Sequence, residues 1–214
     1  MKKEEKKKIK KKDITQAKIL KAARKVFAKY SYDAGSIRMI AKEGGFEFGL
    51  IRYYYPNKAE LFRTVIRGAC EELSQIHEMA MEGMETLRPE QGFSLYLDRY
   101  LDYFFENPTG LQIIVNNIYW PQDPNVDIPG YEFVPHILSE TRKQIEKTLN
   151  ISAPREELYR FSDSLNAHVF MFMGGSSCQA QLMGLDPESK EYLNWVKETL
   201  KYLYLPHLKR LLFF

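Results

Sequence analysis

Cysteine is scarce in this chain of 214 residues, and its two copies, Cys70 and Cys178, lie far apart without a CxxC spacing. This excludes a disulfide-stapled scaffold, and we expect two buried thiols of a reducing compartment. Long apolar runs are also absent, since no stretch approaches the roughly 18 residues that a membrane span needs. The lysine-rich start lacks the apolar segment of a secretory signal. We therefore expect a cytoplasmic protein without a membrane partner.

The motifs of enzyme active sites are missing as well. The four histidines are scattered, and neither HExxH nor a Cys/His cluster supports a metal. The glycine pairs at 44–45 and 174–175 lack both the motif residues and the strand context of a phosphate-binding loop. No Ser/His/Asp or Cys/His arrangement can be inferred. We therefore expect no enzymatic activity, no metal and no cofactor.

Positive charge is concentrated at one end of the chain. Residues 1–60 hold 17 Lys and Arg against 7 Asp and Glu, a net +10, whereas residues 61–214 hold 14 against 21, a net −7. A basic module on an acidic body is typical of a DNA-binding head with a separate regulatory domain. Eight lysines lie in residues 2–12, which we expect to be a disordered tail. This tail is either an arm that reaches DNA phosphates or a solvated segment that adds only non-specific affinity.

The most informative segment is SIRMIAKEGGFEFGLIRYYYPNKAEL, residues 36–61. Two short helical patterns flank a glycine pair, and a third helix begins after Asn57, which is the layout of a helix-turn-helix with a supporting helix. Ala41 supplies the small residue where the two helices cross, and Gly45 suits the turn. From spacing alone, a plain helical hairpin inside an all-α domain remains the alternative.

The apolar positions predict which side of the second helix is buried. Ile40, Phe46, Ile51 and Tyr54 fall where the two helices should share a core. The outward face then carries aromatic side chains and an arginine, a combination that suits a nucleic-acid surface because arginine engages phosphate or guanine. The DNA-contacting residues that we predict are Ser36, Arg38, Glu47, Phe48, Gly49, Leu50, Arg52, Tyr53 and Lys58.

The flanking sequence supports this layout. Ile19, Ala22, Ala23, Val26 and Phe27 follow steps of three and four, so they form one buried helix face upstream. Ser36 is placed to cap the next helix. Asn57, with Glu60 three residues later, forms a capping-box pattern, and Pro56 stops the preceding helix.

Together, ILKAARKVFAKYSYDAGSIRMIAKEGGFEFGLIRYYYPNKAELF resembles the N-terminal DNA-binding domain of the TetR family of bacterial transcriptional regulators. The resemblance covers about residues 15–65, and the rest of the chain matches only in length and helical character. It implies an all-α homodimer, usually a repressor, that a small ligand releases from double-stranded operator DNA. Glu47 stands where Ser or Thr is usual, Phe48 where Lys or Arg is frequent, and Arg52 where Tyr is common. The operator sequence is therefore not implied.

The pattern of the whole chain predicts an all-α protein with about nine helices. We expect helices near 14–30, 36–43, 47–54, 57–82, 90–106, 107–119, 131–149, 154–184 and 187–211, with a proline-rich loop at 120–130. Gly184 should stop the eighth helix, Asp186 cap the ninth and Pro187 open it. This gives a basic tail at 1–12, a DNA-binding domain at 13–56, and a ligand-binding and dimerisation domain at 57–214.

The last two helices carry more apolar surface than one core face needs. This pattern predicts a homodimer held by a four-helix interface, with a buried central helix of the protomer as the alternative. The interface residues that we predict are Phe161, Leu165, Leu193, Val196, Leu200, Leu203 and His207.

Aromatic side chains crowd the middle helices, with a few polar groups nearby in sequence. Small-ligand sites are built this way, although aromatic stripes at helical spacing also form plain core. The ligand-contacting residues that we predict are Tyr96, Tyr100, Tyr103, Phe104, Asn117, Trp120, His136, His168 and Phe172. The expected function is thus a ligand-responsive DNA-binding regulator, most simply a repressor with an apolar or aromatic effector. The alternatives are a ligand-independent regulator, an activator, or a helical protein-interaction module without DNA specificity.

Overall fold

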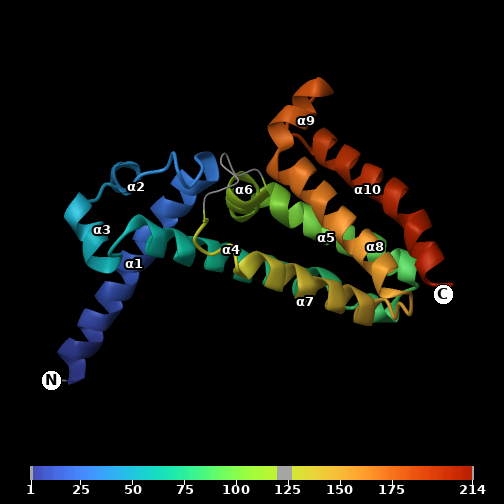
Figure 1. Ribbon diagram of the computed structural model, residues 1–214, viewed down its shortest axis with the longest axis horizontal. Coiled ribbons are helices and arrows are strands. Elements are labelled where there is room, and N and C mark those ends of the chain that lie inside the picture. Colours follow the sequence, from blue (N-terminus) through green and yellow to red (C-terminus); the bar gives the residue numbers. More distant parts are fainter. Residues whose placement is uncertain (1, 120–126, 214) are drawn as a thin grey trace.

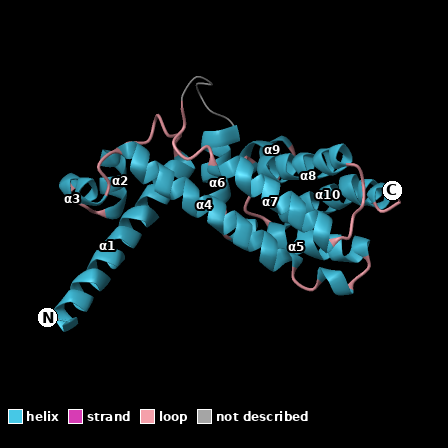
Figure 2. Ribbon diagram, turned by 60° about the horizontal axis from the view of Figure 1, so that its bottom comes forward, coloured by secondary structure: helices cyan, strands magenta, loops and turns pink. Residues whose placement is uncertain are grey.

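A computed structural model describes residues 2–119 and 127–213, and within these ranges every regular element is helical (Figure 2). The predicted all-α class is confirmed, with ten α-helices in place of about nine. The elements in chain order are α1 Lys2–Lys29, α2 Ile37–Gly44, α3 Phe48–Tyr54, α4 Lys58–Met81, η1 Met84–Thr86, α5 Pro89–Glu106, α6 Thr109–Ile114, η2 Val115–Tyr119, α7 Phe133–Thr148, α8 Arg155–Val169, η3 Phe170–Gly174, α9 Ser176–Leu182 and α10 Lys190–Leu211.

The first helix is longer than the sequence pattern predicts. It begins at Lys2 rather than near residue 14, so α1 includes the lysine-rich segment that the sequence pattern assigns to a tail. Lysine and glutamate both have good helix propensity, which allows the helix to extend beyond its packed part. The packed part is the predicted one, since Ile19, Ala23 and Phe27 are buried. Figure 2 shows the N-terminal part of α1 projecting away from the body.

Helix α4 connects the two ends of the molecule (Figure 1). Helices α1, α2 and α3 gather around its N-terminal end, while α5, α7, α8 and α10 form the larger domain towards its C-terminal end. The predicted cap is confirmed, because Asn57 Oδ1 accepts from the backbone N–H of Glu60 at 2.8 Å. One helix therefore belongs to both the N-terminal three-helix unit and the larger domain.

The larger domain is a stack of helices around an apolar core. α4 packs against α5 and α7, and α10 packs against α5 and α8. Aromatic rings fill the space between these helices, as in the contact between Phe93 and Phe161, whose ring centroids are 5.5 Å apart. In Figure 1, α8 and α10 run next to each other at the C-terminal end of the molecule.

The predicted continuous helix from 154 to 184 is wrong. α8 ends at Val169, a π-helical turn η3 follows, and α9 begins at Ser176. The physical reason is the pair Gly174-Gly175, where Gly175 has φ −102° and ψ 22° and leaves helical geometry. Gly184 ends this region in the left-handed conformation at φ 68°, as expected of a helix stop.

The start of the last helix also differs from the prediction. Ser189, not Asp186, caps α10, because its hydroxyl accepts from the backbone N–H of Tyr192 at 3.1 Å. Asp186 instead forms a local turn in which its carboxylate accepts from the N–H of Glu188 at 2.9 Å. Both residues are good cap formers, and the three-residue difference reflects which turn the preceding loop allows.

The two cysteines have different surroundings. Cys70 on α4 is buried as predicted, but Cys178 on α9 is exposed, so the expectation of two buried thiols is wrong for Cys178. Within residues 2–119 and 127–213, no group of three His, Cys, Asp or Glu side chains is placed to hold a metal ion. The helices of these ranges are also too short or too polar to cross a membrane.

Candidate DNA-binding interface and effector grooves

Local caps determine the geometry of the helix-turn-helix. Ser36 Oγ accepts from the backbone N–H of Met39 at 3.2 Å and starts α2. Gly45 ends α2 at φ 66°, and the N–H of Phe46 donates to Ala41 O at 2.8 Å. These bonds form a Schellman-type end that only a residue tolerant of positive φ completes without strain. The turn therefore holds α3 at a fixed angle to α2.

The buried side of α3 differs from the prediction at one position. Ile40 and Ile51 are fully buried as expected, but Tyr54 is half-buried and Tyr55 occupies the core instead. The helix ends at Tyr54, and the extended backbone of Tyr55, at φ −132°, breaks the helical periodicity and turns its ring inward. The hydroxyl of Tyr55 accepts a hydrogen bond from Gln16 Nε2 at 3.2 Å, which ties α3 to α1.

The outward face of α3 presents large side chains to solvent. Tyr53 is 77% exposed, and Phe48 and Leu50 are also exposed. The guanidinium of Arg52 lies 5.2 Å from the centroid of the Phe48 ring, a cation–π contact that preorders the arginine. A Cβ added to Gly49 would meet no atom within 4 Å, so this position leaves open space on the same face. The arrangement fits a surface that approaches a duplex closely.

Two of the other predicted DNA-contacting residues, Ser36 and Lys58, make hydrogen bonds within the chain. The hydroxyl of Ser36 is occupied by its cap, and Glu47 precedes α3 without a capping hydrogen bond from its side chain. Lys58 is half-buried, and its ammonium donates to Tyr32 O at 2.8 Å and to Gly35 O at 3.4 Å. Lys58 thus binds the loop between α1 and α2, and any contact that it makes with phosphate stays a prediction. The side chain of Arg38 on α2 is exposed.

The predicted ligand residues that the structure describes do not line one common cavity. Tyr96 and Tyr100 are buried, and their hydroxyls lie 2.9 Å from Nδ1 and Nε2 of His77, respectively. Burial lowers the pKa of His77 to about 3, so the ring is neutral at physiological pH. Sequence reasoning missed His77 as their partner, although the four-residue spacing of the two tyrosines on one helix face was a usable signal.

The remaining predicted ligand residues in the described ranges form two small aromatic contacts, Tyr103 with Phe104 and His168 with Phe172, and not one common site. The hydroxyl of Tyr103 donates to Glu72 Oε1 at 2.9 Å, and burial together with Glu72 raises the pKa of Tyr103 to about 12. Nδ1 of His168 lies 2.7 Å from the hydroxyl oxygen of Tyr204. Phe104 and Phe172 are buried in the core, Asn117 contacts α1, and Trp120 lies outside the described residues. None of these described positions joins His136 on α7.

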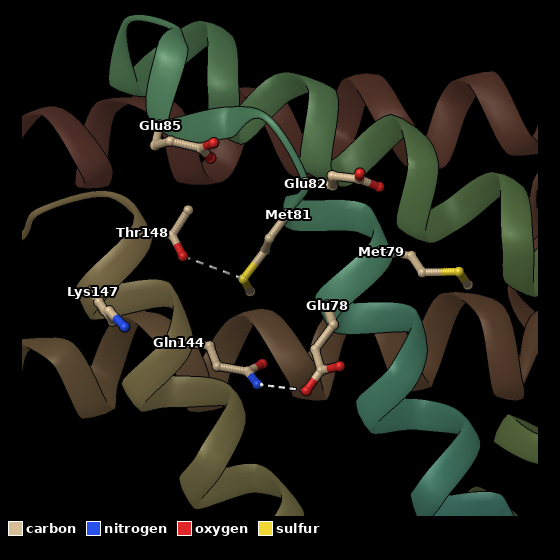
Figure 3. A pocket seen from close by; sticks show the side chains of 8 residues that line it. All are labelled: Glu78, Met79, Met81, Glu82, Glu85, Gln144, Lys147 and Thr148. Atoms are coloured by element: carbon tan, nitrogen blue, oxygen red, sulfur yellow. Dashed lines mark hydrogen bonds between the residues drawn. The ribbon is translucent and has the colours of Figure 1, made fainter.

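Two grooves of the larger domain follow α4 and α7, while a third, of about 450 Å³, lies beside the C-terminal end of α5 and includes the predicted residue Phe104 together with Met173 and Tyr192. The first groove, of about 620 Å³, lies where α4 and α7 end (Figure 3), lined by Glu78, Met79, Met81, Glu82, Glu85, Gln144, Lys147 and Thr148. Gln144 Nε2 donates to Glu78 Oε1 at 3.3 Å across it. A neighbouring groove of about 420 Å³ shares Glu78 and includes Phe133, His136 and Ile137. Of the predicted ligand residues that the structure describes, only His136 lines either of these two grooves.

Most of the predicted dimer residues belong to the core of the protomer. Phe161, Leu165, Leu193, Val196 and Leu200 are all buried within one chain. Their helices pack on α5 and on each other, which is the buried-helix alternative that the pattern left open. Leu203 is 44% exposed, and His207 is half-buried beside Phe161 at a ring distance of 5.4 Å. Met171, Leu182 and Tyr202 are further large exposed side chains on these elements.

The fold and the site define a two-part, all-helical protein that carries a helix-turn-helix at its N-terminal end. Residues 19–65 match the family described as "Bacterial regulatory proteins, tetR family". The resemblance inferred from the sequence is therefore confirmed, and the chain has the DNA-binding domain and fold of a TetR-family transcription regulator.

Several solved structures share the fold of this chain. A transcriptional regulator from Rhodococcus sp. Rha1 is 18% identical with a TM-score of 0.65 and covers 89% of this chain and 96% of its own. The TetR family transcriptional regulator PfmR from Thermus thermophilus is 13% identical with a TM-score of 0.62, and the match covers 89% of this chain and 97% of PfmR. A tetR-family transcriptional regulator from Streptomyces coelicolor is 17% identical with a TM-score of 0.58, and the match covers 94% of this chain and 89% of that protein. No curated protein matches the chain.

Proposed function

We propose that the chain is a cytoplasmic, non-enzymatic transcription regulator that binds operator DNA as a homodimer and is released by a small molecule. The single observation that carries the DNA-binding part is α3, whose exposed face holds Phe48, Leu50, Arg52 and Tyr53 on a rigid turn. The net charge of +10 in residues 1–60 supports it, because duplex affinity rests largely on phosphate neutralisation. We place the DNA-binding domain at 13–56 and the regulatory domain at 57–214.

The test of DNA binding is a selection of duplexes from a random library, followed by competition with unselected DNA. We expect a selected duplex to bind at least a hundredfold more tightly than random DNA. Arg52→Ala and Tyr53→Ala should each cost about 1–3 kcal/mol of binding free energy. Arg88 provides a matched control, because it is exposed at the start of α5 beyond the C-terminal end of α4, and Arg88→Ala should leave binding unchanged. Equal affinity for selected and random DNA would leave the protein-interaction module as the better function.

The homodimer is supported by large apolar side chains left uncovered at the C-terminal end. Met171, Leu182, Tyr202 and Leu203 are exposed on η3, α9 and α10. A helix-turn-helix reads only a few base pairs, so two heads about one helical turn of DNA apart are needed for useful specificity. Sedimentation at micromolar concentration tests this, and a monomer would overturn it.

The effector is proposed to be a small apolar or aromatic molecule. The grooves along α4 and α7 support this site better than the aromatic residues that the sequence pattern favoured, because Tyr96, Tyr100 and Phe172 are buried in the core. Glu78, Glu82 and Glu85 line the larger groove and disfavour an anionic effector by charge repulsion. A thermal-shift screen should find a ligand whose affinity falls when operator DNA is present, since coupling is reciprocal. A ligand that binds equally well with and without DNA would support ligand-independent regulation instead.

A further inference from the structure

Two adjacent asparagines of the larger domain bind the end of the first helix. Asn116 and Asn117 lie in the π-helical turn η2, which continues α6. Asn117 is 1% exposed, and its Nδ2 donates to Phe27 O at 3.2 Å and to Ile113 O at 2.8 Å. Asn116 Nδ2 donates to Ala28 O at 2.6 Å. Both bonds to α1 span almost 90 residues of sequence, so they join the two domains.

These bonds satisfy groups that α1 leaves open. The helix ends at Lys29, and the last carbonyls of an α-helix have no partner within the helix. The carbonyls of Phe27 and Ala28 belong to this set, and the two asparagines supply their donors. An amide nitrogen must face a carbonyl and an amide oxygen must face an N–H, so the partners also determine the orientation of the Asn117 side chain. The C-terminal cap of α1 thus comes from the regulatory domain.

The same side chain holds the connector that leads to the helix-turn-helix. Asn117 Oδ1 accepts from the backbone N–H of Tyr32 at 2.5 Å. The carbonyl of Tyr32 accepts from Lys58 Nζ, and its ring lies 4.7 Å from that of Phe62 on α4. Tyr32 is therefore fixed by η2 on one side and by α4 on the other. A displacement of η2 would therefore move Tyr32, which leads into the helix-turn-helix.

A second close approach connects η2 to the other π-helical turn. A Cβ placed on Gly174 of η3 would lie 2.4 Å from Cγ2 of Val115, the residue immediately before Asn116. Only glycine allows η3 to approach η2 at this distance. η3 continues α8, the helix that packs against α7 and α10. A continuous path of contacts therefore leads from the α7–α8–α10 part of the domain, through Val115 and the two asparagines, to Tyr32.

We infer that Asn116 and Asn117 form an amide clasp that positions the DNA-reading unit, and that α8 acts on this clasp through Gly174 and Val115. The effect on DNA binding rests on the proposed function, whereas the clasp itself does not. Without the clasp, the helix-turn-helix unit samples more orientations relative to the larger domain. The apparent affinity for DNA is then reduced in proportion to the fraction of molecules whose orientation allows binding. Asn116 and Asn117 are positioning residues and are not expected to contact DNA themselves.

The test combines amide exchange with DNA binding in the full-length chain. We expect Asn117→Ala to speed the exchange of the Tyr32 amide at least tenfold and to weaken binding of a selected duplex about tenfold. Asn116→Ala should act in the same direction through Ala28. Gly174→Ala should do likewise, although it touches neither DNA nor the DNA-binding unit. Asn107→Ala is the matched control, because its amide bonds Tyr103 O at the end of the helix that precedes it, and both readouts should stay at the wild-type value.

The outcomes separate the clasp from general destabilisation and from the proposed function. All variants are compared well below the melting temperature of the least stable one. If Asn117→Ala does not fold, the results for Asn116→Ala and Gly174→Ala decide whether the clasp exists. Unchanged exchange at Tyr32 would overturn the clasp, and faster exchange with unchanged DNA affinity would overturn its positioning role. A wild-type chain that binds no duplex selectively would overturn the proposed function, while the exchange data would still decide whether the clasp exists.

Discussion

Acid should destabilise this protein in a way that depends largely on one buried ring. His77 is fully buried, and each of its nitrogens lies 2.9 Å from a tyrosine hydroxyl, of Tyr96 or of Tyr100. A neutral ring satisfies both contacts, because one nitrogen donates and the other accepts. Burial lowers the pKa of His77 from 6.5 to about 3 because the charged ring would lose its hydration. Protonation therefore favours the unfolded chain.

The size of the effect follows from linkage. The folded pKa lies below the unfolded one, so the stabilisation is fully present above pH 6.5 and is lost as the pH falls towards 3. Each pH unit within this window removes about 1.4 kcal/mol, since one pKa unit corresponds to that free energy. Between about pH 7 and pH 4.5, His77 alone should lower the free energy of unfolding by about 2.5 kcal/mol. This is a large share of the roughly 5–15 kcal/mol typical of a folded domain.

The assay is urea unfolding at several pH values for the wild type and His77→Gln. Glutamine keeps one donor and one acceptor but does not titrate, so its own cost is constant with pH. We expect the stability gap between the two proteins to shrink by about 2.5 kcal/mol from pH 7 to pH 4.5. His136→Gln, at an exposed histidine, should keep the wild-type profile. Parallel profiles for wild type and His77→Gln would refute the reasoning.

Three further predictions concern the surface and the turn. Deleting residues 1–12 should flatten the salt dependence of DNA binding by about 0.9 in log–log slope for each phosphate that the segment neutralises, and an unchanged slope would mean that it does not touch DNA. Leu203→Glu should convert the dimer to a folded monomer in sedimentation, whereas Leu200→Glu should unfold the chain because Leu200 is buried. Gly45→Ala should lower the free energy of unfolding by about 1 kcal/mol through its positive φ, measured by urea titration, and no loss would contradict the strained-turn argument.

Local signals in the sequence were sufficient for the helix-turn-helix. Ser36, Gly45 and Asn57 act on neighbours a few residues away, and their chemistry determines the result wherever the helix lies in the fold. The all-α class followed for the same reason, because helical periodicity is a property of short windows. The one misplaced side chain, Tyr55 in place of Tyr54, lies where the helical period stops.

Partners distant in sequence could not be predicted in this way. Asn117 was assigned to a ligand, but its partners on α1 are about 90 residues away, and no local pattern specifies them. Leu200 was assigned to a dimer interface, since an apolar helix face in a sequence does not reveal whether it packs against the same chain or against a second copy. Gly174 lies close to Val115, a proximity that only the tertiary arrangement creates and that no local pattern specifies.

The difference between the two cysteines makes the chain suitable for site-specific labelling without mutation. Burial raises the pKa of the Cys70 thiol to about 12, and the carboxylate of Glu71 adds to this rise. At neutral pH only on the order of one in ten thousand or fewer Cys70 side chains is a thiolate, the form that reacts with maleimides. Cys178 is exposed on α9, close in sequence to Gly174. A single fluorophore attached there would report the movements of α9 and the neighbouring η3 in the otherwise unaltered protein.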